Sequence, residues 1–218
     1  AGELLGAMDG CRSKALKPGI FTRIVALTIA VMMVASFVLV LAGCSANDPL
    51  AEQFREGGNK NYIAGDGTVT EYSEENRPEA KAWGGITESG DRIDSVQLEG
   101  VVTVMNWWYA ACAPCRDEAP DLVALSEEFA EDGVQFIGVN VRDTQETALA
   151  FARNFQVTYP SIMDAQSGAV SLAFTGVVTP QAVPTTLVID ADGRVSSKIL
   201  GRIDRSILAE LIETAIER

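Results

Sequence analysis

Two cysteines three positions apart are the residues of this chain best suited to chemistry. Cys112 and Cys115 flank Ala113 and Pro114, between a β-branched run and a stretch with apolar residues at helical spacing. The first N–H groups of a helix are unpaired and partly positive, so they stabilise a thiolate and lower its pKa from about 8.5 to roughly 3.5–7.5. We therefore expect Cys112, at the open end of the helix, to be the nucleophile. Cys115, one turn in, would resolve the mixed disulfide.

A metal site and a purely structural disulfide are the alternatives for this pair. Zinc needs about four nitrogen or sulfur ligands, but the chain has only two further cysteines, Cys11 and Cys44, and no histidine. A disulfide across so short a loop removes little chain entropy. Redox chemistry is therefore favoured, carried by a Cys112–Cys115 disulfide with no other cofactor.

Composition excludes several other classes of protein. The 218 residues suffice for one domain and its accessories. Seventeen basic against thirty acidic residues give a net charge of −13, which repels phosphate backbones and argues against a nucleic-acid partner. The absence of histidine excludes Ser-His and Cys-His catalysis and histidine-ligated haem.

The N-terminal part has the pattern of a targeting segment. Ile24 to Ala42 carries no charge, follows several basic residues, and as a helix would be roughly 28 Å long, close to the thickness of a bilayer core. Leu41-Ala42-Gly43-Cys44 resembles a bacterial lipobox. We interpret residues 1–44 as a signal peptide with lipidation at Cys44, or alternatively as an uncleaved membrane anchor. Either reading places the remainder at the extracytoplasmic face of the membrane.

Beyond this segment the pattern predicts a polar linker over 45–82, with one short strand at Thr68–Tyr72, and a compact domain over 83–218. Alternation of strand and helix patterns indicates an α/β fold, with a central mixed sheet flanked by helices. The expected elements are a hairpin within 84–98, strands at 101–107, 134–139, 185–190 and 195–200, and helices at 114–129, 144–155, 166–174 and from Asp204 to about 218.

Residues 106–120, with the sequence NWWYAACAPCRDEAP, resemble the active-site stretch of TlpA/ResA-type thioredoxin-like proteins. These are membrane-tethered, extracytoplasmic thiol–disulfide oxidoreductases, and the resemblance implies a thioredoxin-like fold with an N-terminal β-hairpin. Val183-Pro184, directly before an expected strand, resembles the family's cis-proline segment. The resemblance then puts Pro184 opposite the cysteines and lets the Val183 backbone pair with a substrate strand; the alternative is an ordinary proline at a strand start.

The resemblance also assigns roles to neighbouring residues. Trp108, Ala113 and Pro114 are expected to contact substrate together with Val183. The sequence departs from the family pattern at Ala111, where a tryptophan is usual, so the nucleophile is expected to be less covered.

A second departure concerns the proton of Cys115. Thioredoxin has a buried aspartate where this chain has Asn106, which cannot titrate. Glu118 lies three residues after Cys115 on the same helix face, at a place where the family has an acidic residue that influences cysteine acidity. We expect Glu118 to relay the proton; the alternative is a solvated glutamate that merely favours the helix dipole.

Family resemblance further implies a reductant of protein disulfides, for example in apocytochrome c, recharged by a membrane electron donor of the CcdA type. A disulfide-forming oxidant is the main alternative, because potentials of CxxC proteins spread widely. A thiol peroxidase is less favoured, since its motif needs threonine where Tyr109 stands. A non-enzymatic binding lipoprotein is the last alternative considered.

Overall fold

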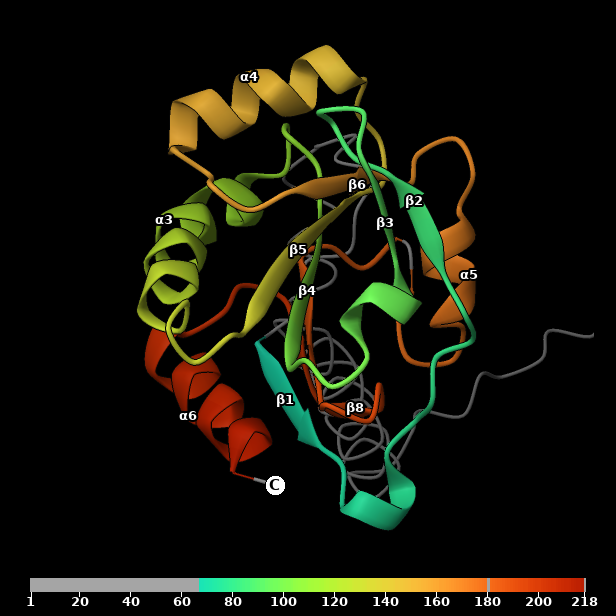
Figure 1. Ribbon diagram of the computed structural model, residues 1–218. Helices are drawn as coiled ribbons and strands as arrows, with labels where there is room; N and C mark the ends of the chain where they lie inside the picture. The colour runs from blue at the N-terminus through green and yellow to red at the C-terminus, as the bar shows by residue number, and fades with distance from the viewer. Residues whose placement is uncertain (1–66, 180, 218) are drawn as a thin grey trace, which may run out of the picture. The chain divides into compact units, whose positions relative to one another are not determined.

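The computed structural model describes residues 67–179 and 181–217 (Figure 1). The signal peptide expected over 1–44, its lipidation site Cys44 and most of the expected linker lie outside these residues. Among the helices that are described, none is long and apolar enough to cross a membrane.

A six-stranded mixed sheet forms the centre of the domain, in the order β1-β8-β7-β4-β5-β6. β4 runs parallel to β5, and β5 to β6, whereas the other neighbours pair antiparallel. A separate hairpin of β2 and β3 precedes β4 in the chain, as the sequence predicts. The strands are β1 (Thr68–Glu71), β2 (Gly84–Ile86), β3 (Arg92–Asp94), β4 (Thr103–Trp108), β5 (Gln135–Asn140), β6 (Ser161–Met163), β7 (Thr185–Ile189) and β8 (Val195–Leu200).

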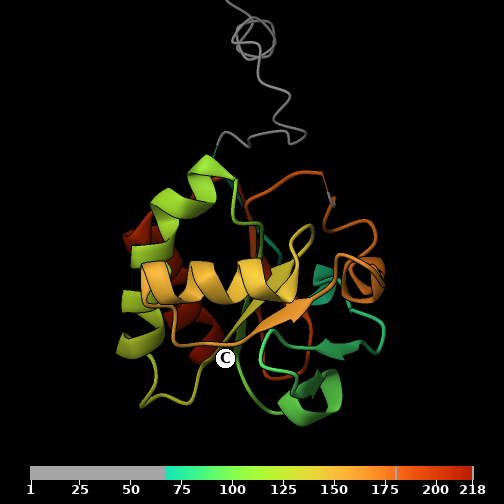
Figure 2. The same cartoon turned by 90° about the horizontal axis from the view of Figure 1, so that it is seen from above.

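Helices flank the sheet (Figures 1 and 2). α3 and α6 pack on one face, where their leucines join Val104 of β4 and Val188 of β7 in one apolar cluster. α5 packs on the opposite face, where Trp107 donates a hydrogen bond to Ser171. The helices are α3 (Ala113–Glu128), α4 (Gln145–Phe155), α5 (Ala169–Ala173) and α6 (Arg205–Ile216), with short 3-10 helices η1 (Glu74–Asn76) and η2 (Ser95–Leu98).

Local sequence explains where the main elements begin. All six residues of β4 are buried, as expected for a β-branched and apolar run at the centre of a sheet. Thr144 and Asp204 cap α4 and α6, because each side chain accepts a hydrogen bond from a backbone N–H of the first turn. The expected α/β fold with a central mixed sheet is therefore confirmed.

Two parts of the fold differ from the prediction. β6 was not expected, because its three residues are too few to show a pattern. Residues 67–82 were assigned to the linker, but they belong to the folded domain: β1 pairs with β8 along the sheet edge, and Arg77 forms a buried ion pair with Asp190 at 2.7 Å. The polar composition of residues 67–82 gives no indication of either contact. The expected strand at Thr68–Tyr72 is confirmed as Thr68–Glu71.

The register of the central strands determines where the cysteines lie. β4 and β7 are antiparallel, and Trp107 is paired with Thr185. The chain leaving β4 and the chain entering β7 therefore meet at the same edge of the sheet. The CxxC segment follows β4, and the Val183–Pro184 bond precedes β7, so the two segments become neighbours.

Candidate active site

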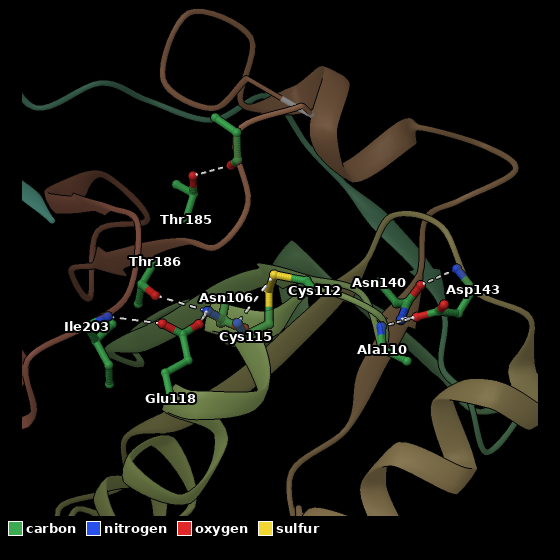
Figure 3. Close-up of a disulfide and its surroundings, with 11 residues drawn as sticks. Asn106, Ala110, Cys112, Cys115, Glu118, Asn140, Asp143, Thr185, Thr186 and Ile203 are labelled. Atoms are coloured by element: carbon green, nitrogen blue, oxygen red, sulfur yellow. Dashed lines mark hydrogen bonds between the residues drawn. A yellow bond between two sulfur atoms is a disulfide. The ribbon is translucent and has the colours of Figure 1, made fainter. Parts of the chain in front are cut away.

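The two cysteines form a disulfide where β4 gives way to α3 (Figure 3). Their Cα atoms are 5.3 Å apart. Cys112 is the N-cap of α3, and its Sγ accepts a hydrogen bond from the backbone N–H of Cys115 at 3.3 Å. Pro114 stands in the first turn of the helix, where its missing N–H removes no intrahelical bond. The first turn thus presents a donor to the sulfur that would carry negative charge.

Both sulfurs are buried in this disulfide-bonded state. Cys112 is 0% exposed and Cys115 is 2% exposed. Cys112 does stand at the N-terminal end of the helix, as expected, but it is not the less covered residue that the substitution at Ala111 suggests. Ala111, the residue in place of the family's tryptophan, is itself exposed. Other side chains cover the disulfide, since Cys112 belongs to the same buried cluster as Tyr109 and Val183.

The Val183–Pro184 peptide bond is cis. Its segment lies across from the disulfide, before Thr185 (Figure 3). Thr185 fixes the turn by donating from Oγ1 to the carbonyl of Ala182 at 2.6 Å. The Pro184 carbonyl accepts from the N–H of Gly201 at 2.8 Å. Val183, which precedes the cis bond, shares a buried cluster with Cys112, so this segment packs near the CxxC segment; the role of Pro184 in the exchange stays a prediction.

The four residues expected to contact substrate differ in accessibility. Ala113 is exposed and Pro114 is half-buried, whereas Val183 is buried. Trp108 does not lie at the surface: its indole packs 4.3 Å from the Phe151 ring, centre to centre. Trp108 is thus a core residue, because it belongs to a strand buried on both faces, and its assignment to substrate contact is wrong.

Glu118 is buried beneath the disulfide. Its side chain is 0% exposed, so it is not the solvated glutamate of the alternative interpretation. Oε1 accepts from Asn106 Nδ2 at 2.8 Å, and Oε2 accepts from the backbone N–H of Ile203 at 3.0 Å. Asn106 Nδ2 also donates to Thr186 Oγ1 at 3.0 Å. The carboxyl group therefore joins β4, α3 and the loop before α6 (Figure 3).

Opposing effects set the charge state of Glu118. Burial raises its pKa, while the hydrogen bonds from Ile203 and Asn106 and the charge of Arg202 lower it; burial dominates, and the pKa rises from 4.5 to about 8. A group with this pKa releases and binds protons near neutral pH. This property suits an exchange of protons with a thiol.

A second polar cluster positions the loop that leads to Cys112. The sequence analysis did not predict this cluster. Asp143 Oδ2 accepts from the N–H of Ala110 at 2.6 Å and from Asn140 Nδ2 at 2.7 Å. Asn140 Oδ1 in turn accepts from the N–H of Asp143 at 2.8 Å. The only sequence signal for this cluster is that Asn140 ends a buried strand. That this strand lies beside the CxxC strand can be recognised only once the sheet order is known.

No group of three or more cysteine, aspartate or glutamate side chains is arranged to hold a metal ion in the described part of the chain. That the site needs no cofactor stays a prediction.

A thioredoxin-like sheet, a CxxC disulfide at a helix start and a cis-proline across from it together form the architecture of thioredoxin-like thiol–disulfide oxidoreductases. The sequence profile of the AhpC/TSA family matches residues 77–198. The chain therefore belongs to the AhpC/TSA family.

Individual relatives agree with this class. The thiol:disulfide interchange protein HelX of Rhodobacter capsulatus is 30% identical over 120 residues, which cover 55% of this chain and 64% of HelX. The thiol-disulfide oxidoreductase ResA of Halalkalibacterium halodurans is 27% identical over 124 residues, covering 57% and 68%. The chain thus spans about two thirds of the length of these relatives. The resemblance to ResA-type proteins is confirmed.

A solved structure supports the fold. A secreted thiol-disulfide isomerase from Corynebacterium glutamicum superimposes with a TM-score of 0.65 at 27% identity. The superposition covers 72% of this chain and 97% of the isomerase. The thioredoxin-like fold predicted for this chain is confirmed.

Burial of Glu118 predicts an unusual pH dependence of stability. Between its ordinary pKa of 4.5 and its raised pKa of about 8, the folded protein binds more protons than the unfolded chain. The free energy of unfolding should therefore fall as pH rises through this range. We expect Glu118→Gln to reduce this fall, measured by denaturant unfolding from pH 4.5 to 8.5; burial also raises the pKa of Glu88, which contributes a fall of the same sign in both proteins.

The control is Glu128→Gln, the same change at a half-exposed position of α3. It should leave the pH dependence as in the wild type. A wild-type slope that Glu118→Gln does not alter would contradict the assignment. Absolute stability is not the readout, because glutamine cannot accept both hydrogen bonds and loses one at every pH.

Proposed function

We propose that this protein is an extracytoplasmic thiol–disulfide oxidoreductase that exchanges its Cys112–Cys115 disulfide with protein substrates. The observation that carries the proposal is that Cys112 Sγ, at the N-cap of α3, accepts from a backbone N–H, in the same buried cluster as Val183 of the cis Val183–Pro184 bond. Names of the relatives HelX and ResA, both thiol–disulfide proteins, support it.

The exchange transfers two electrons in two steps. In the reduced protein, the Cys112 thiolate attacks a substrate disulfide, forms a mixed disulfide and releases one substrate thiolate. Cys115 then loses its proton and attacks Cys112 Sγ, which closes the protein disulfide and releases the second substrate thiol. Run backwards, the same steps oxidise a substrate dithiol.

Substrate would approach between the helix start and the cis-proline segment. Ala113 is exposed beside Cys112, and Pro114 borders it. Pairing of a substrate strand with the Val183 backbone requires that Val183, buried in the disulfide form, become accessible.

Glu118 is proposed as the proton relay for Cys115. It stands one turn after Cys115 on the same face of α3. Its pKa of about 8 lies close to that of an ordinary thiol, about 8.5, so proton transfer between the two groups is nearly balanced.

Membrane tethering and redox direction complete the proposal. The lipobox-like Leu41–Cys44 stretch and the preceding apolar run support a lipid anchor at Cys44, or an N-terminal helix that stays in the membrane. The resemblance to ResA-type proteins supports a reductant role, with apocytochrome c as an example of substrate and a CcdA-type membrane protein as electron donor. Likeness to a secreted isomerase makes a disulfide-forming or reshuffling role the second candidate.

Membership of the AhpC/TSA family is also compatible with peroxidase activity, but the residues support this function less well. Tyr109 stands where the peroxidatic motif has threonine. The Tyr109 ring is buried, with the Arg142 guanidinium 4.4 Å from its centre. Its place in the fold is thus that of a packed aromatic residue beside the disulfide.

The two cysteines should respond differently to substitution. In chains whose Cys11 and Cys44 are replaced by alanine, Cys112→Ser should abolish reduction of a protein disulfide such as that of insulin. Cys115→Ser should accumulate a mixed disulfide through Cys112, because the resolving thiol is missing. Both are read by gel shift and mass spectrometry. Exchange that survives Cys112→Ser, or peroxide consumption faster than disulfide exchange, would argue against the proposal.

Replacing Glu118 should change how Cys115 ionises. An ionised carboxylate one turn away disfavours the Cys115 thiolate by like-charge repulsion, so Glu118→Gln should lower the pKa of Cys115. It should nevertheless slow resolution of the mixed disulfide, because glutamine cannot accept the proton that Cys115 releases. Thiolate absorbance and alkylation rates against pH measure both effects. Glu128→Gln serves again as the control, and cysteine pKa values unchanged in Glu118→Gln would eliminate the relay.

One redox titration against glutathione decides the direction. A potential more negative than the glutathione couple is expected for a reductant, since its dithiol then gives up electrons to substrate disulfides. A potential well above that couple would replace the reductant proposal by the oxidant one.

A further inference from the structure

The loop between β8 and α6 is bonded to both halves of the candidate active site. The N–H of Gly201 donates to the carbonyl of Pro184 at 2.8 Å, and the N–H of Ile203 donates to Glu118 Oε2 at 3.0 Å. Only Arg202 separates these two donors. The backbone on each side of Arg202 is thus tied to the cis-proline segment and to the buried carboxyl group.

Arg202 itself faces the surface. Its side chain is 55% exposed, and its guanidinium Nη2 lies 3.8 Å from Asp121 Oδ2. Asp121 follows Glu118 by three residues in α3, so it is a neighbour of Glu118 along the helix. Both ends of this ion pair therefore lie beside Glu118, one on its own helix and one on the loop that hydrogen-bonds to it.

We propose that Arg202 is a positioning residue for thiol–disulfide exchange, which acts by stabilising the ionised form of Glu118 from the solvent side. The proposal rests on the proposed function, because it gives Glu118 a role in deprotonating Cys115. Arg202 touches neither sulfur nor substrate in this account. Arg202 acts through the Glu118 carboxyl group, which accepts a hydrogen bond from the same loop.

The charges that act on Glu118 come from two elements. Among the described residues, Arg202 lowers the pKa of Glu118 and Asp121 raises it. Tyr159 has its own pKa raised, first by burial and then by the charge of Glu118; Asn106, on β4, is a neutral donor. Arg202 is thus the cation that offsets part of the cost of ionising Glu118 inside the domain.

Two features argue that this charge matters more than an ordinary surface ion pair does. Exposed pairs contribute little because water and salt screen them. Here, however, one affected group is fully buried, and field lines through a protein interior are screened less than those through water. Moreover, the hydrogen bonds of Gly201 and Ile203 fix the Arg202 backbone beside Glu118.

The test compares variants with opposite expected signs. Arg202→Gln should raise the midpoint of the Glu118 titration by about 0.2–0.7 pH units, and Asp121→Asn should lower it. Arg202→Lys keeps the charge and should stay near the wild type. The titration is followed by NMR of side-chain carboxyl carbons in the oxidised full chain, with the Glu118 signal identified by its absence in Glu118→Gln.

Arg205→Gln is the matched control. Arg205 lines the same surface groove as Arg202, but its ion-pair partner, at 2.9 Å, is Glu128 in the last turn of α3 and not a neighbour of Glu118. The Glu118 midpoint should not move in this variant. The Cys115 ionisation profile of the reduced proteins should shift in Arg202→Gln and stay unchanged in Arg205→Gln.

Each outcome is decisive. A Glu118 midpoint that is the same in Arg202→Gln and Arg205→Gln would overturn the proposal, as would a downward shift in Arg202→Gln. A midpoint that moves while Cys115 ionisation does not would also overturn it, because Arg202 would then act on Glu118 alone. Since the oxidised protein is titrated, a wild type without exchange activity would refute the proposed function separately.

Discussion

The antiparallel pairing of β4 with β7 is the constraint on which the site depends. Trp107 lies opposite Thr185, and Asn106 lies opposite Thr186. The first pair brings the CxxC loop and the cis-proline segment to one edge of the sheet. The second places Asn106 and Thr186 side by side on the face covered by α3, where Asn106 reaches both Thr186 and Glu118. A slip of one residue would turn these side chains to opposite faces.

Burial of Glu118 and Cys112 at this edge of the sheet has two consequences: it prepares the proton-exchanging group, and it restricts access to the sulfur. The interior raises the pKa of Glu118 and strengthens every hydrogen bond made to it. It also covers Cys112 completely in the disulfide form. A sulfur without accessible surface cannot meet a substrate sulfur, so exchange requires the Tyr109–Cys112 loop or the segment before Pro184 to move. The Cys112 side of the site is therefore closed in the oxidised form.

Local pattern was sufficient for some parts of this site and insufficient for others. The strand–CxPC–helix order and the proline before β7 are local signals, and both agree with the structure. The burial of Glu118 is not a local property, because it depends on Ile203, 85 residues away, and on the sheet order. Trp108 was misplaced for a related reason, since only its packing on Phe151 shows which way the indole points.

The predicted start of the folded domain at residue 83 also differs from the structure for a physical reason. Composition identifies polar stretches as linkers, but β1 is held by backbone pairing with β8, which any side chain permits. Arg77 is likewise buried only because Asp190 neutralises it. Sequence hydropathy cannot detect a charge that is paired in the fold.

The negative net charge of the protein makes the hydrogen-bond donors beside Cys112 and Glu118 important. With seventeen basic and thirty acidic residues, the average field of this protein disfavours any new anion, including a thiolate at Cys112 and a carboxylate at Glu118. Screening by salt limits that field to roughly 8–10 Å, so groups within this range decide the outcome. The N–H of Cys115 aimed at Cys112 Sγ and the N–H of Ile203 aimed at Glu118 are such groups. These backbone donors, fixed in place by the fold, favour an anion at each of the two groups, while burial still raises the pKa of Glu118 to about 8.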